Sequence, residues 1–217
     1  MPDFHCSAIL FDLDGVLVDS TASVARQWRK WAEAKKIDPE TVMKIAHGVR
    51  AIEIIRQVAP HLDAEAEVRR IEKMEVNDHD GVAVMPGAAE LVRSVAEGHW
   101  AVVTSGRRHL ATGRLQWAKL PVPKIMVPAD EVSKGKPDPE PYLKAAELLR
   151  VKPSDCLVIE DAPAGIRAAR AAGMKVIAIT STYPASELKE ADAVVKALAE
   201  IHVRNENMGK LLRVSTK

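Results

Sequence analysis

One stretch near the start of the chain, AILFDLDGVLVDS at residues 8–20, constrains the fold more than any other. Its four leading apolar residues are typical of a strand that is buried on both faces, as in a parallel sheet. Aspartate is rare in strands, so Asp12 and Asp14 at the end of this run indicate chemistry. A plain Asp-Gly turn would account for Asp14 and Gly15 but not for Asp12. Two residues apart on a strand, the aspartates share one side, at the carboxyl end where open α/β sheets bind their ligands.

The segment from residue 20 to about residue 80 carries helical patterns and no convincing strand. Apolar residues recur there at spacings of three and four, which indicates a helix with one buried face. Ser20 or Thr21 is placed to cap the start of this helix. These patterns predict a small helical insertion at residues 18–82.

After Met85-Pro86-Gly87 the pattern changes to strands that alternate with helices. The apolar runs that predict strands lie at residues 100–104, 124–127, 156–159, 175–179 and 193–195. Such alternation predicts an α/β fold with a doubly wound parallel sheet. This core would comprise residues 1–17 and 83–217, and the tail from Arg204 onward would have little to pack against.

The charge balance excludes several classes of partner. Lys and Arg number 31 against 30 Asp and Glu, so we expect no binding to nucleic acid or to an anionic membrane surface. No apolar run approaches ~20 residues, and the first residues lack the pattern of a signal peptide. Cys6 and Cys156 lie in apolar strand-like runs, where we expect them to pack as small hydrophobic residues and not to form a disulfide. Together these features predict a cytoplasmic protein. Because no exposed apolar stripe or heptad stands out, we expect a monomer.

Polar residues follow three of the predicted strands, and one loop carries a lysine. They are Asp12 and Asp14, Thr104 and Ser105, Glu160 and Asp161, and Lys136 in the loop 128–141. In a parallel sheet these strand ends share one edge, so the side chains would converge. Four carboxylates at one place would repel unless a cation is present, and hard oxygen ligands suit Mg²⁺. The hydroxyls and Lys136 suit a phosphate, and the closely spaced His or Cys pairs of a zinc site are absent from the sequence.

Each of these residues also has a simpler explanation. A hydroxyl residue such as Thr104 could cap the following helix, and Lys136 could be a solvated loop lysine. Glu160 and Asp161 could form a helix entry. These explanations do not account for all of them lying at strand ends or in one polar loop, and this coincidence favours a site.

The same residues resemble the four motifs of the haloacid dehalogenase superfamily, most members of which are phosphatases. The matching segments, in order, are FDLDGVLVDS at 11–20, VVTSG at 102–106, KGKPDPEPY at 134–142 and VIEDAPAGIRAA at 158–169. The resemblance covers nearly the whole chain, and the helical insertion resembles the small helical cap of that superfamily. Together with HGVR at 47–50, the motifs are similar to those of glycerol-phosphate and 2-deoxyglucose-6-phosphate phosphatases.

The resemblance implies roles for the carboxylates. Asp12 would attack phosphorus and form an aspartyl-phosphate. Asp14 would protonate the leaving alkoxide and then deprotonate the attacking water. Mg²⁺ would be held by Asp12, the main-chain carbonyl of Asp14, and Asp161, with Glu160 as a further ligand or as a neighbour of the ligands.

The resemblance also implies which residues bind the substrate. Lys136 and either Thr104 or Ser105 would stabilise charge on the transferring phosphoryl group. His47 and Arg50, which alone could be surface residues, would reach down from the cap and read the leaving group.

The implied activity is a Mg²⁺-dependent phosphatase of small phosphorylated polyols or sugars. A sugar phosphomutase of the β-phosphoglucomutase type, which carries the same four motifs, is the alternative. Haloacid dehalogenation needs no metal and fits Asp14 and the Glu160-Asp161 pair less well. A regulatory protein that has lost catalysis is disfavoured because Asp12, Asp14, Lys136 and Asp161 are intact.

Overall fold

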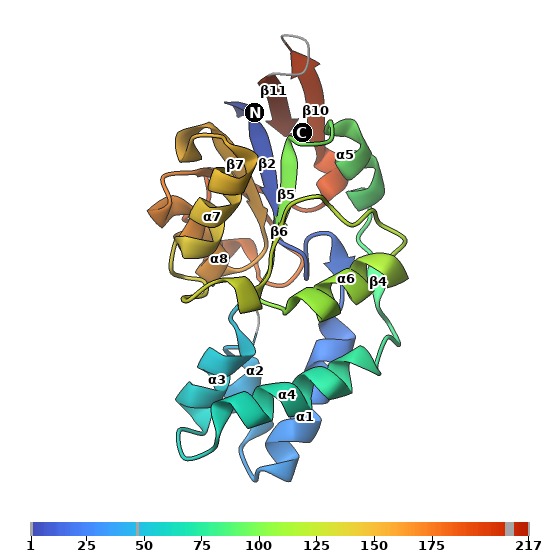
Figure 1. Cartoon of the computed structure of the whole chain (residues 1–217). Coiled ribbons are helices and arrows are strands. Elements are labelled where there is room, and N and C mark those ends of the chain that lie inside the picture. Colours follow the sequence, from blue (N-terminus) through green and yellow to red (C-terminus); the bar gives the residue numbers. More distant parts are fainter. Residues whose placement is uncertain (1, 47, 207–210, 217) are drawn as a thin grey trace.

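The computed structural model describes residues 2–46, 48–206 and 211–216, and a parallel sheet runs through its core (Figure 1). In order across the sheet, the strands are β6 (Met126–Val127), β5 (Trp100–Val103), β2 (Ala8–Phe11), β7 (Cys156–Glu160), β8 (Lys175–Ile179) and β9 (Ala193–Val195). All neighbouring strands are parallel. Every residue of β2, β5 and β7 is buried, as in sheets that are covered on both faces. The predicted α/β fold with a doubly wound parallel sheet is confirmed.

Helices cover both faces of this sheet. They are α5 (Ala88–Ser94), α6 (Arg108–Trp117), α7 (Glu140–Leu149) and α8 (Pro163–Ala171). The alternating side chains of β2 divide between two cores, because Ile9 and Phe11 pack on the side of α5 and α6. Ala8 and Leu10 pack on the side of α7 and α8. The central strand is therefore fixed in register by apolar contacts on both sides.

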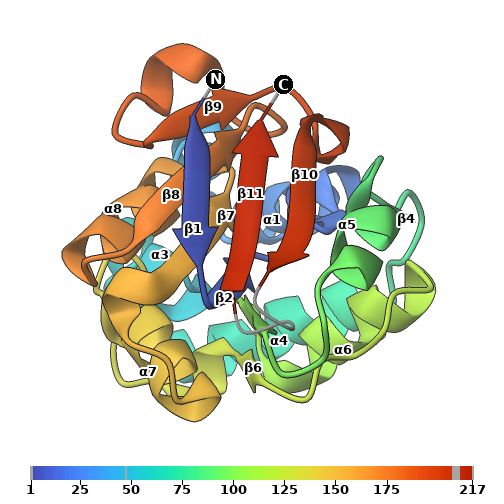
Figure 2. The same ribbon diagram turned by 90° about the horizontal axis from the view of Figure 1, so that it is seen from above.

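A second, antiparallel sheet packs on the side of α5 and α6. Its strands are β1 (Asp3–Cys6), β11 (Leu211–Thr216) and β10 (Ile201–Glu206), in that order, and Figure 2 shows them side by side. Leu212 and Val214 are buried in the core, whereas Arg213 between them is exposed. The expectation that the tail from Arg204 has little to pack against was wrong. Its partner is β1, at the other end of the chain, and no local pattern reveals such a long-range pairing.

The helical insertion has a hydrophobic core of its own. It contains α1 (Thr21–Ala34), α2 (Pro39–Met43), α3 (Ala51–Val58) and α4 (Ala64–Val76), which Figure 1 shows below the sheet. Trp28 and Trp31 pack edge to face within this core. The chain leaves and re-enters the sheet domain through β3 (Val18–Asp19) and β4 (Ala83–Val84), which pair antiparallel. These strands lie beside the expected boundaries at residues 18 and 82, although the division into two domains stays a prediction.

The remaining short elements are turns of 3₁₀ helix at Ala129–Glu131, Pro153–Asp155, Ala185–Glu187 and Leu198–Glu200. Cys6 and Cys156 are both buried free thiols. Of the helices in the described part of the chain, none has the length and apolar character needed to cross a membrane.

Candidate active site

The carboxyl ends of three adjacent strands form the floor of the site. Asp12 follows β2, Thr104 follows β5, and Glu160 and Asp161 lie at the end of β7. These strands are neighbours in the sheet, so their ends meet at the edge that faces the helical insertion. The expected convergence of polar residues is present in the structure.

Lys136 joins two of these carboxylates. Its Nζ atom donates to Asp12 Oδ1 at 2.6 Å, to Glu160 Oε1 at 2.7 Å and to the Val103 carbonyl at 3.2 Å. Only 1% of the residue is exposed, so it is not the solvated loop lysine of the simpler explanation. Burial alone would lower the pKa of Lys136, but the carboxylates of Asp12 and Glu160 outweigh it and hold the pKa well above its usual value.

The buried carboxylates lack enough positive charge around them. Burial, opposed by Lys136, raises the pKa of Asp12 to about 7. Burial, with the charges of Glu160 and Asp12, raises the pKa of Asp161 well above its usual value. Oxygen atoms of Asp12, Glu160 and Asp161 all lie within 4.8 Å of one another. This set of hard oxygen donors fits Mg²⁺, whose charge would favour the ionised carboxylates.

Glu160 differs from the other two carboxylates in being fully hydrogen-bonded. Its Oε1 accepts from Lys136 and from the Tyr142 hydroxyl at 3.0 Å. Its Oε2 accepts from the main-chain N–H groups of Asp161 at 2.8 Å and Ala162 at 2.9 Å. A Cβ atom on Gly165 of α8 would overlap this carboxylate. The close packing explains a glycine inside α8 and leaves Glu160 little freedom to move.

Asp14 faces the cavity and is held by two donors. The Ser20 hydroxyl donates to its Oδ1 at 2.7 Å, and Arg114 Nη1 donates to its Oδ2 at 2.7 Å. Ser20 is the N-cap residue of α1 but makes no side-chain capping bond, because its hydroxyl is turned to Asp14. Gly15 has φ of +84°, and a Cβ atom there would overlap the carboxylate of Asp161. Glycine thus lets the turn after β2 pass close to the acidic cluster.

The two hydroxyl residues after β5 have different surroundings. Thr104 is buried, and its Oγ1 accepts from the Gly106 N–H at 3.0 Å. The Ser105 hydroxyl donates to the Gly48 carbonyl of the helical insertion at 3.0 Å. Among the described residues, the Thr104 hydroxyl donates to no partner, whereas that of Ser105 already donates to Gly48.

Arg50 bridges the helical insertion and the sheet domain. Its guanidinium donates to the carbonyl of Val132 at 3.1 Å and of Ser133 at 3.0 Å, and it pairs with Glu53 at 2.6 Å. It also lines the cavity, while its donors serve the contact between the two parts, so its role in reading a leaving group stays a prediction. His47 lies outside the described residues.

A cavity of about 470 Å³ lies between the strand ends and the helical insertion. Asp12, Asp14, Thr104 and Asp161 line its floor, and Trp28 lines its wall. This volume is in the range of sites for small molecules.

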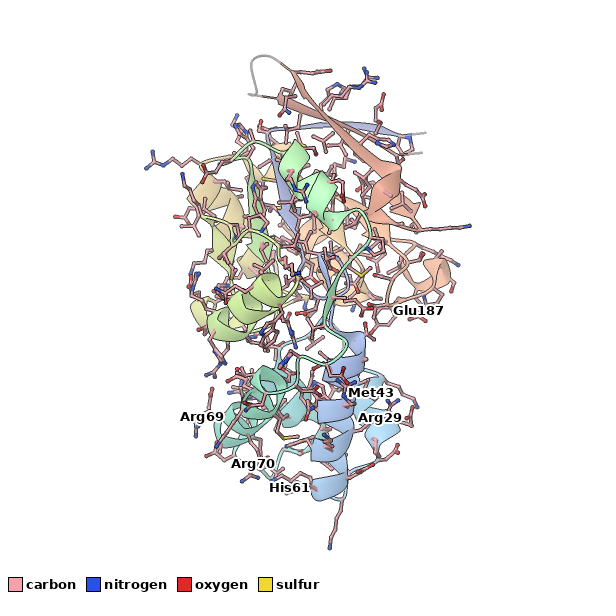
Figure 3. The ribbon with its side chains drawn as sticks, turned by 90° about the vertical axis from the view of Figure 1, so that its right-hand side faces the viewer. Arg29, Met43, His61, Arg69, Arg70 and Glu187 are labelled. Carbon is pink, nitrogen blue, oxygen red and sulfur yellow. The ribbon has the colours of Figure 1, made fainter. Side chains whose placement is uncertain are left out.

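An acidic face of α4 borders this cavity. Glu72 and Glu75 are buried there, whereas Arg69 and Arg70 lie on the outer side of the insertion (Figure 3). Burial, only partly opposed by Arg114, raises the pKa of Glu75 to about 7. The roof of the cavity is therefore rich in carboxyl groups.

Arg114 is the main site residue that the sequence interpretation missed. It is buried in the stripe of α6 that also contains Leu110, Ala111 and Leu115. A charged residue within an otherwise apolar stripe was a usable signal, because arginine is almost never buried unless it is paired. Tyr142 and Glu75 were also missed, and their spacing alone carries no signal of a site.

Comparisons with known proteins agree with this geometry. The family model described as haloacid dehalogenase-like hydrolase matches residues 9–179. The chain is 39% identical to hexitol phosphatase A of Escherichia coli (strain K12), over 96% of this chain and 99% of that protein. It is 35% identical to 2-deoxyglucose-6-phosphate phosphatase 2 of Saccharomyces cerevisiae, over 99% of this chain and 98% of that protein. A crystal structure of a hydrolase from Pseudomonas syringae has a TM-score of 0.79 and 29% identity, covering 88% of this chain and 94% of that one.

The chain therefore belongs to the haloacid dehalogenase-like hydrolases. More narrowly, it is an enzyme of the phosphoric monoester hydrolase class, because the relatives that it matches over nearly its full length are phosphatases. The family and the enzyme class expected from the four motifs are confirmed.

Proposed function

We propose that this protein is a Mg²⁺-dependent phosphatase of small phosphorylated polyols or sugars, and that Asp12 is its nucleophile. One observation carries the proposal: Lys136 fixes Asp12 Oδ1 at the floor of the cavity. Among the residues that the structure describes, no donor bonds to the other oxygen, Oδ2, which is thus free to attack. The names of the two relatives, a hexitol phosphatase and a 2-deoxyglucose-6-phosphate phosphatase, support the substrate class.

The reaction would proceed in two displacements at phosphorus. In the first, Asp12 forms a bond to phosphorus as the ester bond breaks, and Asp14 gives a proton to the leaving alkoxide. In the second, Asp14 takes a proton from water, the water oxygen attacks phosphorus, and inorganic phosphate leaves with Asp12 restored. The ion pair with Arg114 and the hydrogen bond from Ser20 orient Asp14 for both steps.

The metal would be held by Asp12, Asp161 and the main-chain carbonyl of Asp14. Mg²⁺, when bound, supplies positive charge that offsets repulsion between the nucleophile and the phosphate. We assign Glu160 to holding Lys136, since each of its oxygens already accepts two hydrogen bonds.

Two further residues of the sheet domain would bind the phosphoryl group. Lys136 supplies charge close to Asp12. Thr104 is a better candidate than Ser105, because its hydroxyl proton is free while that of Ser105 is donated to Gly48. Preorganised donors of this kind contribute most of the catalysis in phosphoryl transfer.

Residues 18–82 would act as a cap that excludes bulk water from the cavity. The hydrogen bonds from Arg50 to the loop at Val132 and Ser133 support this role, as does the bond from Ser105 to Gly48. We propose that the protein works as a monomer, since one chain supplies every group of the site.

The charge of the cavity favours a phosphatase over a phosphomutase. A mutase must bind a second phosphate in the same cavity, which requires free cations. Three of the four arginines that line the cavity in the described part of the chain are paired, Arg50 with Glu53, Arg107 with Glu72, and Arg114 with Asp14. The fourth, Arg56 of α3, is exposed to solvent. The carboxyl groups on α4 would also repel a second phosphate.

The test is release of inorganic phosphate from glycerol phosphates, hexitol phosphates, hexose phosphates and glucose 1-phosphate, with Mg²⁺ and with EDTA. We expect turnover of polyol or hexose phosphates that needs the metal and falls by at least about 10³-fold in Asp12→Asn. Isomerisation of glucose 1-phosphate with little free phosphate would instead establish the mutase. No turnover by the folded protein would refute both.

A further inference from the structure

Arg114 carries a buried donor that makes no hydrogen bond to the described residues. Only 4% of Arg114 is exposed, and its Nη1 atom donates a hydrogen bond to Asp14. Its Nη2 atom forms an ion pair with Glu75 Oε2 at 3.5 Å but has no hydrogen-bond partner among the described residues. A buried donor without a hydrogen bond costs about 1–3 kcal/mol, and more when it is charged, so such an atom calls for an explanation.

Both groups lie where a ligand would be. Arg114 and Glu75 line the same cavity as Asp12 and Asp14, Arg114 from α6 of the sheet domain and Glu75 from α4 of the helical insertion. A donor on one side and an acceptor on the other form a pair across the space between the two domains. The pair is complete only when the insertion sits over the sheet domain.

We propose that Arg114 Nη2 and Glu75 bind one hydroxyl group of the leaving alcohol. The inference rests on the proposed phosphatase function and deepens it. A hydroxyl oxygen accepts from Nη2 while its proton is donated to the carboxylate, so a single hydroxyl satisfies both atoms. A phosphate or carboxylate at this position would face Glu75 and its buried neighbour Glu72, which disfavour an anion.

The guanidinium indicates which hydroxyl is bound. Nη1 holds Asp14, the group proposed to protonate the leaving oxygen, and Nη2 belongs to the same rigid fork. The hydroxyl bound by Nη2 is then the one next to the leaving oxygen, on the carbon adjacent to the ester carbon. An open-chain polyol phosphate has a free hydroxyl there. A hexopyranose 6-phosphate has its ring oxygen there, which accepts but cannot donate to Glu75.

A purely structural role is the competing explanation. Arg107 also links α6 to α4, through ion pairs with Glu65 at 3.1 Å and Glu72 at 3.0 Å, and Arg114 could be a second residue that only holds the two helices together. A purely structural ion pair would affect kcat/KM equally for every substrate. The hydroxyl subsite predicts discrimination between two esters that differ by one hydroxyl.

The experiment compares glycerol 1-phosphate with 3-hydroxypropyl phosphate, which lacks only the adjacent hydroxyl, in saturating Mg²⁺. For the wild type we expect kcat/KM to be at least about 10-fold higher for glycerol 1-phosphate, because a lost hydrogen bond to a charged group costs about 1.5–3 kcal/mol. Glu75→Met should lower kcat/KM for glycerol 1-phosphate and bring the ratio near one, with little change for 3-hydroxypropyl phosphate. Arg114→Lys, which keeps one charge but not the fork, should also reduce the ratio.

The matched control is Glu65→Gln, which removes an ion pair between α4 and α6 at an exposed position. It should leave the ratio of the two substrates unchanged. Equal kcat/KM for both esters in the wild type would overturn the subsite, as would an equal loss for both in Glu75→Met. If neither ester nor p-nitrophenyl phosphate is hydrolysed, the phosphatase proposal fails and the subsite with it.

Discussion

Replacing Lys136 by methionine should greatly lower the free energy of unfolding of this protein. Methionine has nearly the volume of the lysine stem, so packing is largely kept. The change removes the ammonium that donates to Asp12, Glu160 and the Val103 carbonyl. Two buried carboxylates are then left without their shared cation.

The magnitude follows from the burial of all three side chains. Removing one partner of a buried ion pair costs about 3–5 kcal/mol. Because Lys136 serves two carboxylates that are at most 4% exposed, we expect a loss near the upper end of that range. Domains of ordinary stability have only about 5–15 kcal/mol in total.

The assay is urea unfolding in EDTA, so that no metal compensates the carboxylates. Glu160→Gln provides the second edge of a double-mutant cycle, since it removes one of the two stranded charges. In that background Lys136→Met should cost less, by about 1–3 kcal/mol. Lys124→Met is the control, because Lys124 pairs with Glu97 at the surface and such pairs contribute about 0–1 kcal/mol.

Two results would refute this reasoning. The first is a cost for Lys136→Met no larger than that for Lys124→Met. The second is an equal cost for Lys136→Met with and without Glu160→Gln, which would mean that the lysine and the carboxylate do not interact.

Three further predictions concern stability. The pKa of Glu75 is raised to about 7 by burial, with Asp14 and Glu72 adding to it and Arg114 opposing it. The native state therefore binds this proton more tightly than the unfolded chain, and stability falls as pH rises from about 4.5 to about 7. Glu75→Gln should remove this fall. The free energy of unfolding of the variant, relative to that of the wild type, should therefore rise by about 3 kcal/mol between pH 4.5 and 7.5. If this difference between variant and wild type were the same at every pH in the range, the raised pKa of Glu75 would be contradicted. Gly113→Ala should raise the melting temperature, because the nearest atoms to the new Cβ atom are in ordinary contact, in the Trp117 ring at 3.6 Å, and alanine favours a helix by about 1 kcal/mol. Gly165→Ala should lower the melting temperature through its clash with the Glu160 carboxylate. The reverse order of the two melting temperatures would contradict the packing. Mg²⁺ at 100 times its dissociation constant should stabilise the protein by about 2.7 kcal/mol, which EDTA should abolish; an unchanged melting temperature would argue against a metal site.

The sequence alone predicted the architecture because local signals and the fold agree. Apolar runs in alternation with helical patterns predict a parallel sheet, and such a sheet brings the carboxyl ends of its strands to one edge. Asp12, Thr104 and Asp161 could be assigned to one site for this reason. Lys136 could be added because it lies in an unusually polar loop and in the third of the four matching motifs. Each of these residues by itself also had a simpler explanation, and it was their coincidence at strand ends and in one polar loop that predicted a site.

Other features depended on contacts between distant parts of the chain. The strand β11 finds its partner β1 about two hundred positions away in sequence, and a segment read by itself is only a polar tail. Ser20 was placed to cap a helix, in which role its hydroxyl oxygen would accept from a main-chain N–H, yet its hydroxyl instead donates to the carboxylate of Asp14 and makes no capping bond. Arg114 lies on α6 beside the sheet and Glu75 on α4 of the helical insertion, and only the packing of the insertion against the rest of the chain brings them together. The sequence by itself determined which strand ends carry polar groups, since the pattern of apolar and polar residues along a strand is a local property. The tertiary structure decided which charges face each other across the cavity, because pairing of buried charges depends on distances that no spacing along the chain specifies.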